Sequence, residues 1–205
     1  ITSGNHIWDK KEIADYINQE NRLLRPANLV EGSPGNGFGI YSTKNQKFKV
    51  GVINLMGNVF MRKTEDVFDS ANKIKKKIIL KKNVDFIVVD FHGEITSEKM
   101  AIGHFFDGYS TGVVGTHTHV PTADTRILEK GTAYQTDIGM CGDYNSVIGM
   151  NKENSLKRFL KKKESIKNFP AEGSATLSGI IIEGDNNTGL ANKITRLIEG
   201  GVLKK

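Results

Sequence analysis

The sequence of 205 residues lacks several features that would define other classes of protein. It has one cysteine, Cys141, so no disulfide can form within the chain, and this favours a reducing compartment such as the cytoplasm. It has only 4 prolines and 25% charged residues, which exclude collagen-like, low-complexity and coiled-coil chains. It has no run of 18 apolar residues, and this excludes a membrane-spanning helix.

The excess of positive charge is modest. Lys and Arg number 29 against 23 Asp and Glu, which gives a net charge of +6 and a pI near 9.3. Such a balance permits an anionic substrate such as a nucleotide, whereas a dedicated nucleic-acid binder would cluster its charge on one face. The lysine-rich segments 73–82 and 161–163 are interpreted as the solvated surfaces of helices.

The first residues resemble the end of a strand that runs directly into a loop. The chain opens Ile-Thr-Ser-Gly-Asn-His, without a methionine, a charged leader or an apolar segment, and so does not match a signal peptide. Because the end of a strand normally follows earlier chain, we expect further residues to precede Ile1.

Hydrophobic periodicity predicts alternating helices and strands early in the chain and mainly strands later. A helix is expected over 9–19, with Asp9 as its N-cap and Ile13, Tyr16 and Ile17 on one face. The other expected helices are 66–82, 95–106 and 152–162, and the expected strands are 48–55, 84–91, 111–115, 123–128, 131–136, 175–183 and 192–198. The apolar segment 84–91 is typical of a central strand covered on both faces. The pattern favours a layered α/β sandwich in a single domain, residues 1–205.

Four of the five histidines follow a predicted strand within a few residues, where open α/β sheets place their functional sites. The sharpest pattern is Gly115-Thr116-His117-Thr118-His119. In an extended chain, residues two apart point to the same face, so both imidazoles could reach one metal ion or two neighbouring ions. Taken alone, His-x-His is common and equally typical of ordinary loop residues.

Two further segments carry candidate ligands. Asn5 precedes His6 after the first expected strand, and an amide oxygen is a suitable ligand for a hard metal ion. A histidine beside a metal ion, but not bound to it, is well placed to act as a general acid. His92 directly follows the strand 84–91 and, by itself, is typical of a loop histidine. The remaining candidates, His104 and Cys141, are interpreted as structural.

Taken together and in this order, the three segments match the C-terminal part of the calcineurin-like metallophosphoesterase pattern. Longer motifs narrow the match: residues 4–12, 25–28, 90–94, 96–99, 113–120 and 136–140. Through these motifs the chain resembles the bacterial YmdB family of cyclic-nucleotide phosphodiesterases over nearly its whole length.

The resemblance implies an α/β/β/α four-layer sandwich with a dinuclear centre of iron or manganese, with zinc as an alternative. It implies a phosphodiester substrate, notably a 2′,3′-cyclic nucleotide. Carried over by motif, Asn5, His92 and His117 would bind one metal ion and His119 the other, while His6 would protonate the leaving oxygen. Glu94 matches the family without being a direct ligand.

The sequence departs from the family pattern at its amino-terminal end. The family opens with Gly-Asp-Val-x-Gly and Asn-Gly-Glu-Asn segments, which supply an Asp, a bridging Glu and an Asn, and neither segment is in this sequence. The sandwich is therefore expected to lack its first strand–helix units. One metal ion would keep three ligands and the other only His119, so we expect the second ion to bind weakly.

Three functional interpretations remain open. The first is a metal-dependent phosphodiesterase of cyclic nucleotides. The second is a catalytically impaired regulatory protein of the same fold that binds nucleotide or RNA. The excess of basic residues and the absence of the amino-terminal metal ligands favour this interpretation. The third is an interaction module with merely structural histidines. No membrane partner is expected, and the resemblance is compatible with a homo-oligomer.

Overall fold

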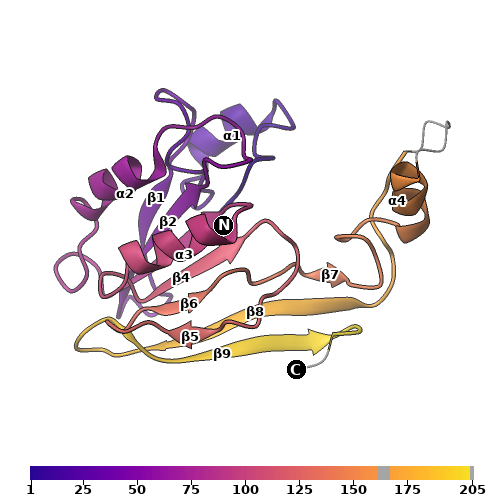
Figure 1. Ribbon diagram of the computed structural model, residues 1–205. Coiled ribbons are helices and arrows are strands. Elements are labelled where there is room, and N and C mark those ends of the chain that lie inside the picture. Colours follow the sequence, from indigo (N-terminus) through magenta and orange to yellow (C-terminus); the bar gives the residue numbers. More distant parts are fainter. Residues whose placement is uncertain (161–166, 204–205) are drawn as a thin grey trace.

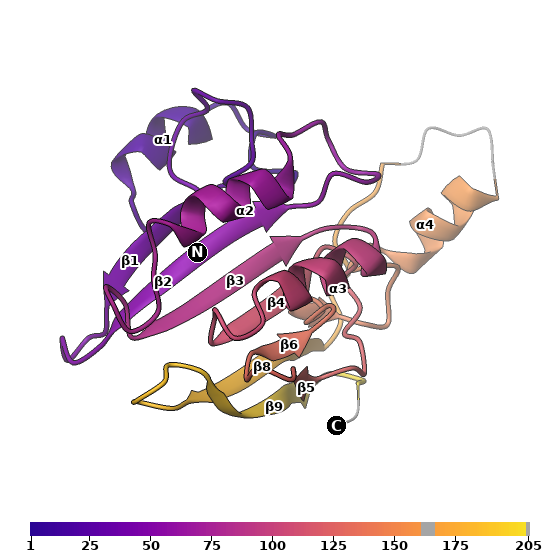
Figure 2. The same cartoon turned by 60° about the vertical axis from the view of Figure 1, so that its left-hand side comes forward.

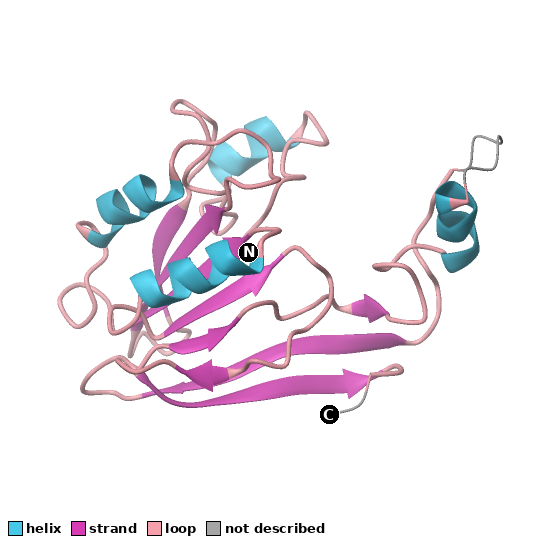
Figure 3. Cartoon of the chain, in the orientation of Figure 1, coloured by secondary structure: helices cyan, strands magenta, loops and turns pink. Residues whose placement is uncertain are grey.

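The computed structural model describes residues 1–160 and 167–203, and it has a mixed α/β fold (Figure 1, Figure 3). Its helices are α1 (Ile13–Gln19), α2 (Val67–Lys75), α3 (Thr96–Phe105) and α4 (Lys152–Phe159). Its strands are β1 (Phe38–Ser42), β2 (Lys49–Met56), β3 (Phe86–His92), β4 (Gly112–Thr116), β5 (Arg126–Ile127), β6 (Ala133–Gln135), β7 (Gly142–Asp143), β8 (Ala175–Gly184) and β9 (Ala191–Gly200). The predicted α/β class is confirmed.

The larger sheet has a parallel centre. Its strand order is β1-β2-β3-β4-β6-β5, in which β2, β3, β4 and β6 run parallel. The two edge strands, β1 and β5, are antiparallel to their neighbours. Because parallel strands end at the same edge of a sheet, the loops after β3 and β4 emerge side by side.

Helices α2 and α3 cover one face of this sheet (Figure 2). On β3, the alternate residues Ile87, Val89 and Phe91 point to that face and are fully buried in the core. On the opposite face, Phe86 and Val88 are only half-buried. The expectation that segment 84–91 is a central strand covered on both faces therefore holds, although the burial is complete only on the side that the helices pack against.

The hairpin of β8 and β9 lies on the other side of the large sheet (Figure 2) and forms a second sheet in the order β7-β8-β9. Thr111 joins the two sheets, since its hydroxyl donates to the carbonyl of Gly189 at 2.6 Å and accepts the N–H of Ile87 at 2.9 Å. In residues 1–160 and 167–203, no helix covers the outer face of the second sheet (Figure 1). The described part of the chain thus shows three layers of the predicted four-layer sandwich.

Two of the expected helices are shorter than predicted. Helix α2 ends at Lys75 rather than at residue 82, because Asn83 folds the following segment into turns by donating to the carbonyl of Lys77 and accepting the N–H of Ile79. Helix α1 begins only at Ile13, and Tyr16 on it is 54% exposed, so this residue does not join the predicted packed face.

Asp9 is not the N-cap of α1, as was expected. The residue before the helix is Glu12, which makes no side-chain cap, and the Asp9 carboxylate binds His6 and Arg62 instead. Lys75 also differs from the expected solvated face, because its ammonium group lies 4.3 Å from the ring centre of Tyr109 and 4.5 Å from that of Phe105.

The later elements match the sequence patterns with shifted ends. The predicted hairpin 123–136 is present as β5 and β6, whereas β1 and β7 were not expected. The predicted end of the helix 152–162 and the lysines 161–163 lie outside the described residues. Among the helices that the structure describes, none combines the length and apolar character needed to cross a bilayer.

Candidate functional site

The candidate site lies at the edge of the large sheet where β3 and β4 end. His92 is the last residue of β3 and pairs in register with Thr116, the last residue of β4, so His117 follows at the same edge. Asn5 reaches this edge from the amino-terminal loop. The approach depends on Gly4, because a Cβ atom there would lie 2.2 Å from Nε2 of His92.

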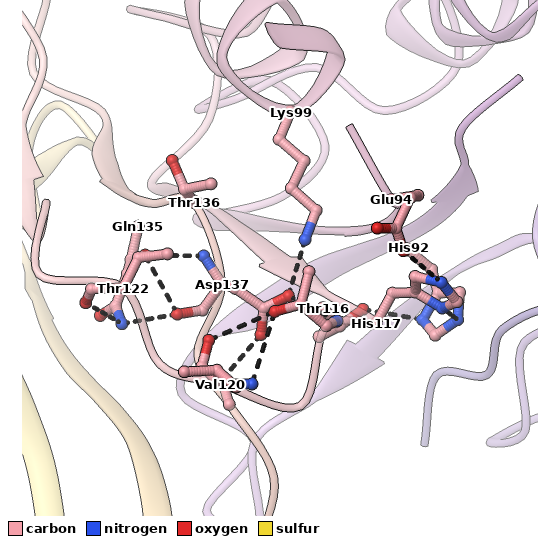
Figure 4. Close-up of polar contacts among 12 residues, drawn as sticks. His92, Glu94, Lys99, Thr116, His117, Val120, Thr122, Gln135, Thr136 and Asp137 are labelled. Atoms are coloured by element: carbon pink, nitrogen blue, oxygen red, sulfur yellow. Dashed lines mark hydrogen bonds and ion pairs between the residues drawn. The ribbon is translucent and has the colours of Figure 1, made fainter. Parts of the chain in front are cut away.

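Three side chains converge at this edge. Nε2 of His92 lies 2.8 Å from Oδ1 of Asn5 and 3.1 Å from Nδ1 of His117. The two imidazole rings meet edge to face with their centres 4.8 Å apart (Figure 4). The structure therefore brings together three of the residues that sequence analysis singled out.

The hydrogen-bond partners of the two imidazoles favour one tautomer of each ring. Thr116 donates its hydroxyl proton to Asp90 at 2.8 Å, so its oxygen accepts from Nδ1–H of His92 at 3.0 Å. Nε2 of His117 lies 3.0 Å from a carboxylate oxygen of Glu94 and donates to it. In these tautomers, Nε2 of His92 and Nδ1 of His117 carry lone pairs.

In these tautomers three acceptor atoms face one another, since the third atom, Oδ1 of Asn5, is also an acceptor. Burial and the neighbouring His117 lower the pKa of His92 to about 4. Burial also lowers the pKa of His117, although Glu94 opposes this effect. Both imidazoles are then neutral near pH 7, which is the form that binds metal ions.

The spacing of the three atoms suits a metal ion. Adjacent ligands of an octahedral ion with bonds of about 2.1 Å lie roughly 3.0 Å apart, and the two distances from Nε2 of His92 are 2.8 and 3.1 Å. Within the described ranges, no three His, Cys, Asp or Glu side chains form a metal-binding group. The converging set is two imidazoles and an amide, a mixture suited to first-row transition metals.

His119 does not join this cluster. Strand β4 ends at Thr116, and the φ angles of His117 and His119 are +109° and +67°, so the segment is not the extended chain from which a shared face was expected. Nδ1 of His119 lies 2.8 Å from the carbonyl of Ile148 and donates to it, which leaves Nε2 free to bind a ligand.

His6 lies on the surface beside the cluster. Its side chain is 75% exposed, and Nδ1 lies 2.7 Å from the carboxylate of Asp9, which also contacts Arg62 at 3.3 Å. The hydrogen bond from His6 is the main reason that the pKa of Asp9 is lowered. The other two polar candidates are apart from the site, since His104 is exposed on α3 and Cys141 donates to the carbonyl of Ser178.

Sequence reasoning missed the polar groups that orient the imidazoles. Asp90 and Thr116 hold His92, and Glu94 was expected only as a family match without a role. Asp90, a carboxylate inside an apolar strand, could have indicated these groups from sequence, because a buried charged group requires specific partners.

The fold and this cluster define a mixed α/β protein with two imidazoles and an amide gathered at the ends of its parallel strands. A model of the family described as YmdB-like protein matches residues 1–197. A protein of Bacillus subtilis (strain 168) named 2′,3′-cyclic-nucleotide 2′-phosphodiesterase is 48% identical over 198 residues, which cover 97% of this chain and 73% of that protein. The chain belongs to the YmdB-like family.

Solved structures agree with this assignment. A hypothetical protein from Thermus thermophilus has a TM-score of 0.84 at 35% identity, covering 98% of this chain and 75% of its own. A structure described as a novel phosphatase from Mycoplasma pneumoniae has a TM-score of 0.80 at 40% identity, covering 98% and 73%. The prediction of an enzyme of the phosphodiesterase or phosphatase class is confirmed by these relatives.

Proposed function

We propose that this chain is a metal-dependent phosphodiesterase that hydrolyses cyclic nucleotides, with 2′,3′-cyclic nucleotides as its preferred class. The observation that carries the proposal is the convergence of Oδ1 of Asn5, Nε2 of His92 and Nδ1 of His117 at the end of the parallel sheet. The name of the Bacillus subtilis relative supports the substrate class.

Asn5, His92 and His117 would hold one transition-metal ion, and Nε2 of His119 would bind a second. Iron and manganese are the expected metals, and zinc is the alternative, because imidazole binds all three. The chemistry that such ions supply when bound is polarisation of the phosphate ester and neutralisation of charge on its equatorial oxygens. Two metal ions, RNA as a substrate and a homo-oligomer remain predictions.

The chain's own groups account for orientation and for proton transfer. Thr116 and Glu94 hold the two clustered imidazoles in the tautomers that present lone pairs. His6 is the general acid: Asp9 accepts from Nδ1–H and so aims Nε2 away from the carboxylate, toward solvent and substrate. A protonated His6 delivers its Nε2 proton to the ribose oxygen that leaves phosphorus.

The leaving group provides a test of this role for His6. A ribose alkoxide needs a proton to leave, whereas p-nitrophenolate is a stable anion. We therefore expect His6→Ala to lower kcat for a 2′,3′-cyclic nucleotide by about 10²–10⁴-fold and to affect bis-p-nitrophenyl phosphate far less. Elemental analysis should find metal content unchanged. Equal losses on both substrates, or loss of metal, would remove His6 from the acid role.

The ligands are tested separately. His92→Ala and His117→Ala should each lower the metal content per chain, whereas His104→Ala, on the exposed side of α3, should not. Full metal content in either of the first two variants would remove that histidine from the ligand set.

A regulatory protein that binds nucleotide or RNA without hydrolysis is the second candidate, and the net charge of +6 favours it. It predicts binding that weakens steeply with salt and no turnover of either substrate. Absence of stoichiometric metal together with absence of turnover would instead support an interaction module.

A further inference from the structure

A buried ion pair lies beneath the loop that carries His117 and His119 (Figure 4). Lys99 on α3 and Asp137 after β6 both have side chains that are 1% exposed, and Nζ lies 2.6 Å from Oδ2. Removing two charges from water costs several kcal/mol for each ion, and an apolar pair of similar size is often as stable. Stability alone therefore does not account for a charged pair at this place.

The carboxylate of Asp137 holds the backbone of the histidine loop. Its Oδ2 accepts the N–H of Thr118 at 3.0 Å, and its Oδ1 accepts the N–H of Gly139 at 2.8 Å. Thr118 is the residue between the two histidines. One ionised side chain, neutralised by Lys99, is thus fixed directly to the middle of the His-x-His segment.

The segment that this bond holds is strained. His117 and His119 both have positive φ angles, +109° and +67°, and such backbone costs about 1–3 kcal/mol at each non-glycine residue. It persists only where the surroundings determine it. The strain has a consequence for the site, because it sends His117 toward His92 and His119 toward the carbonyl of Ile148.

Gly115 explains how Lys99 reaches this position. A Cβ atom on Gly115 would lie 1.7 Å from the carbonyl oxygen of Thr136 and 3.1 Å from Cδ of Lys99. The glycine before the histidines therefore makes room both for the strand that leads to Asp137 and for the lysine side chain. The loop, the helix and the strand end are packed around one ion pair.

We propose that Asp137, paired with Lys99, is a positioning residue that holds His117 and His119 in their separate orientations. Asp137 acts through its bond to Thr118, and Lys99 pairs with the carboxylate so that no unpaired charge is buried there. The inference rests on the proposed function only in assigning the two histidines to metal ions.

The test needs variants that leave no unpaired buried charge, because removing one partner of such a pair costs about 3–5 kcal/mol. Lys99→Met/Asp137→Asn keeps the shape and one acceptor oxygen, whereas Lys99→Met/Asp137→Leu keeps the volume and removes the acceptor. Lys99→Met/Asp137→Ala repeats the second test without added bulk if the leucine variant fails to fold. Asp107→Ala is the control, because Asp107 also accepts two loop N–H groups, those of Lys130 and Thr132, beyond the other end of α3.

The first readout is the set of imidazole ¹⁵N chemical shifts in the metal-free protein, which report the tautomers of His92, His117 and His119. The second is the affinity for Mn²⁺ by calorimetry. We expect the variant without the acceptor to lose the tautomer pattern of His117 and His119 and to bind Mn²⁺ about 10–100-fold more weakly. The asparagine variant should restore most of both properties, and Asp107→Ala should lower only the melting temperature.

The proposal is overturned if the folded leucine or alanine variant keeps the wild-type chemical shifts and Mn²⁺ affinity while its melting temperature changes. It is also overturned if the asparagine variant behaves like the leucine variant. The chemical shifts are measured without metal or substrate, so a wild-type protein that fails to hydrolyse cyclic nucleotides would reject the proposed function and leave this test readable.

Discussion

Gly4 is the residue that allows the amino-terminal loop to approach His92. Because a Cβ atom there would lie 2.2 Å from Nε2, we expect Gly4→Ala to push the imidazole away from Asn5. The affinity for Mn²⁺ should fall at least about tenfold, the size typical of a disturbed ligand environment. Calorimetric titration measures this loss.

The matched control is Gly179→Ala on β8, where a Cβ atom meets nothing within 4 Å. It removes a glycine from the same fold without crowding any ligand, so its Mn²⁺ affinity should equal that of the wild type. An unchanged Mn²⁺ affinity in Gly4→Ala would show that the amino-terminal loop can shift to accommodate the added methyl group without displacing His92.

The pKa of His92 predicts a pH dependence for the metal-free protein. Burial and then His117 lower this pKa from its ordinary 6.5 to about 4. Between these two values the unfolded chain binds a proton that the folded chain does not, so the free energy of unfolding falls as the pH falls from 6.5 toward 4. Each tenfold difference in proton affinity between the two states is equivalent to about 1.4 kcal/mol.

Melting temperatures between pH 4 and pH 7 test this dependence, with His92→Gln as the reference because glutamine does not titrate. We expect the wild type to lose more stability on acidification than the variant does. Parallel curves for the two proteins would show that His92 takes up its proton at the same pH in both states.

Part of the site follows from sequence alone. The resemblance to the family implied that Asn5, His92 and His117 lie together, and the structure shows two of them at the ends of neighbouring parallel strands. The tautomers of the two imidazoles could not be predicted. They depend on the strand register that puts Thr116 beside His92 and on the contact of Asp90 with the Thr116 hydroxyl. The separate orientation of His119 could not be predicted either, since positive φ angles at histidines have no sequence signature.

At the scale of elements, the start of α2 depends on one side chain. Asp66 accepts the N–H of Asp69 at 2.8 Å and so satisfies one of the free donors of the first turn. We expect Asp66→Ala to lower the free energy of unfolding by about 1 kcal/mol, measured by urea denaturation. Mn²⁺ affinity should not change.

Glu12→Ala provides the comparison, because Glu12 stands at the same position before α1 and makes no side-chain cap. Its free energy of unfolding should stay within about 0.5 kcal/mol of the wild type, as is usual for surface substitutions. Equal losses in the two variants would assign the effect to helix propensity rather than to capping.

The elements that sequence predicted well are those that are rich in apolar residues along their length. Strand β3 lies in a nearly uninterrupted apolar segment, helix α3 has several apolar positions, and both lie within two residues of the expected bounds. Helix α2 was predicted too long because Asn83 competes for backbone groups that would continue the helix, a contact between side chain and backbone that periodicity does not show. Strand β1 was missed because an edge strand of 5 residues with mixed burial has no strong alternation.

At the scale of the whole molecule, the candidate site joins distant parts of the chain. The contact between Asn5 and His92 spans 87 residues, and that between His92 and His117 spans 25. An unfolded chain cannot present these three atoms together, so a metal ion that binds them binds the folded state.

Metal binding should therefore stabilise the whole fold. At a free Mn²⁺ concentration of 100 times Kd, mass action adds about 2.7 kcal/mol, which for a chain of this size raises the melting temperature by about 5–10 °C. Calorimetric scans with Mn²⁺ should show this rise in the wild type and lose it in His92→Ala, which removes the central donor. Asp66→Ala, which destabilises the fold elsewhere, should melt earlier and still gain the full increment. A rise of the same size in His92→Ala would place the stabilising ion at other residues. A rise in melting temperature that is lost when a donor is removed would show that the amino-terminal loop and both strand ends act as one cooperative unit.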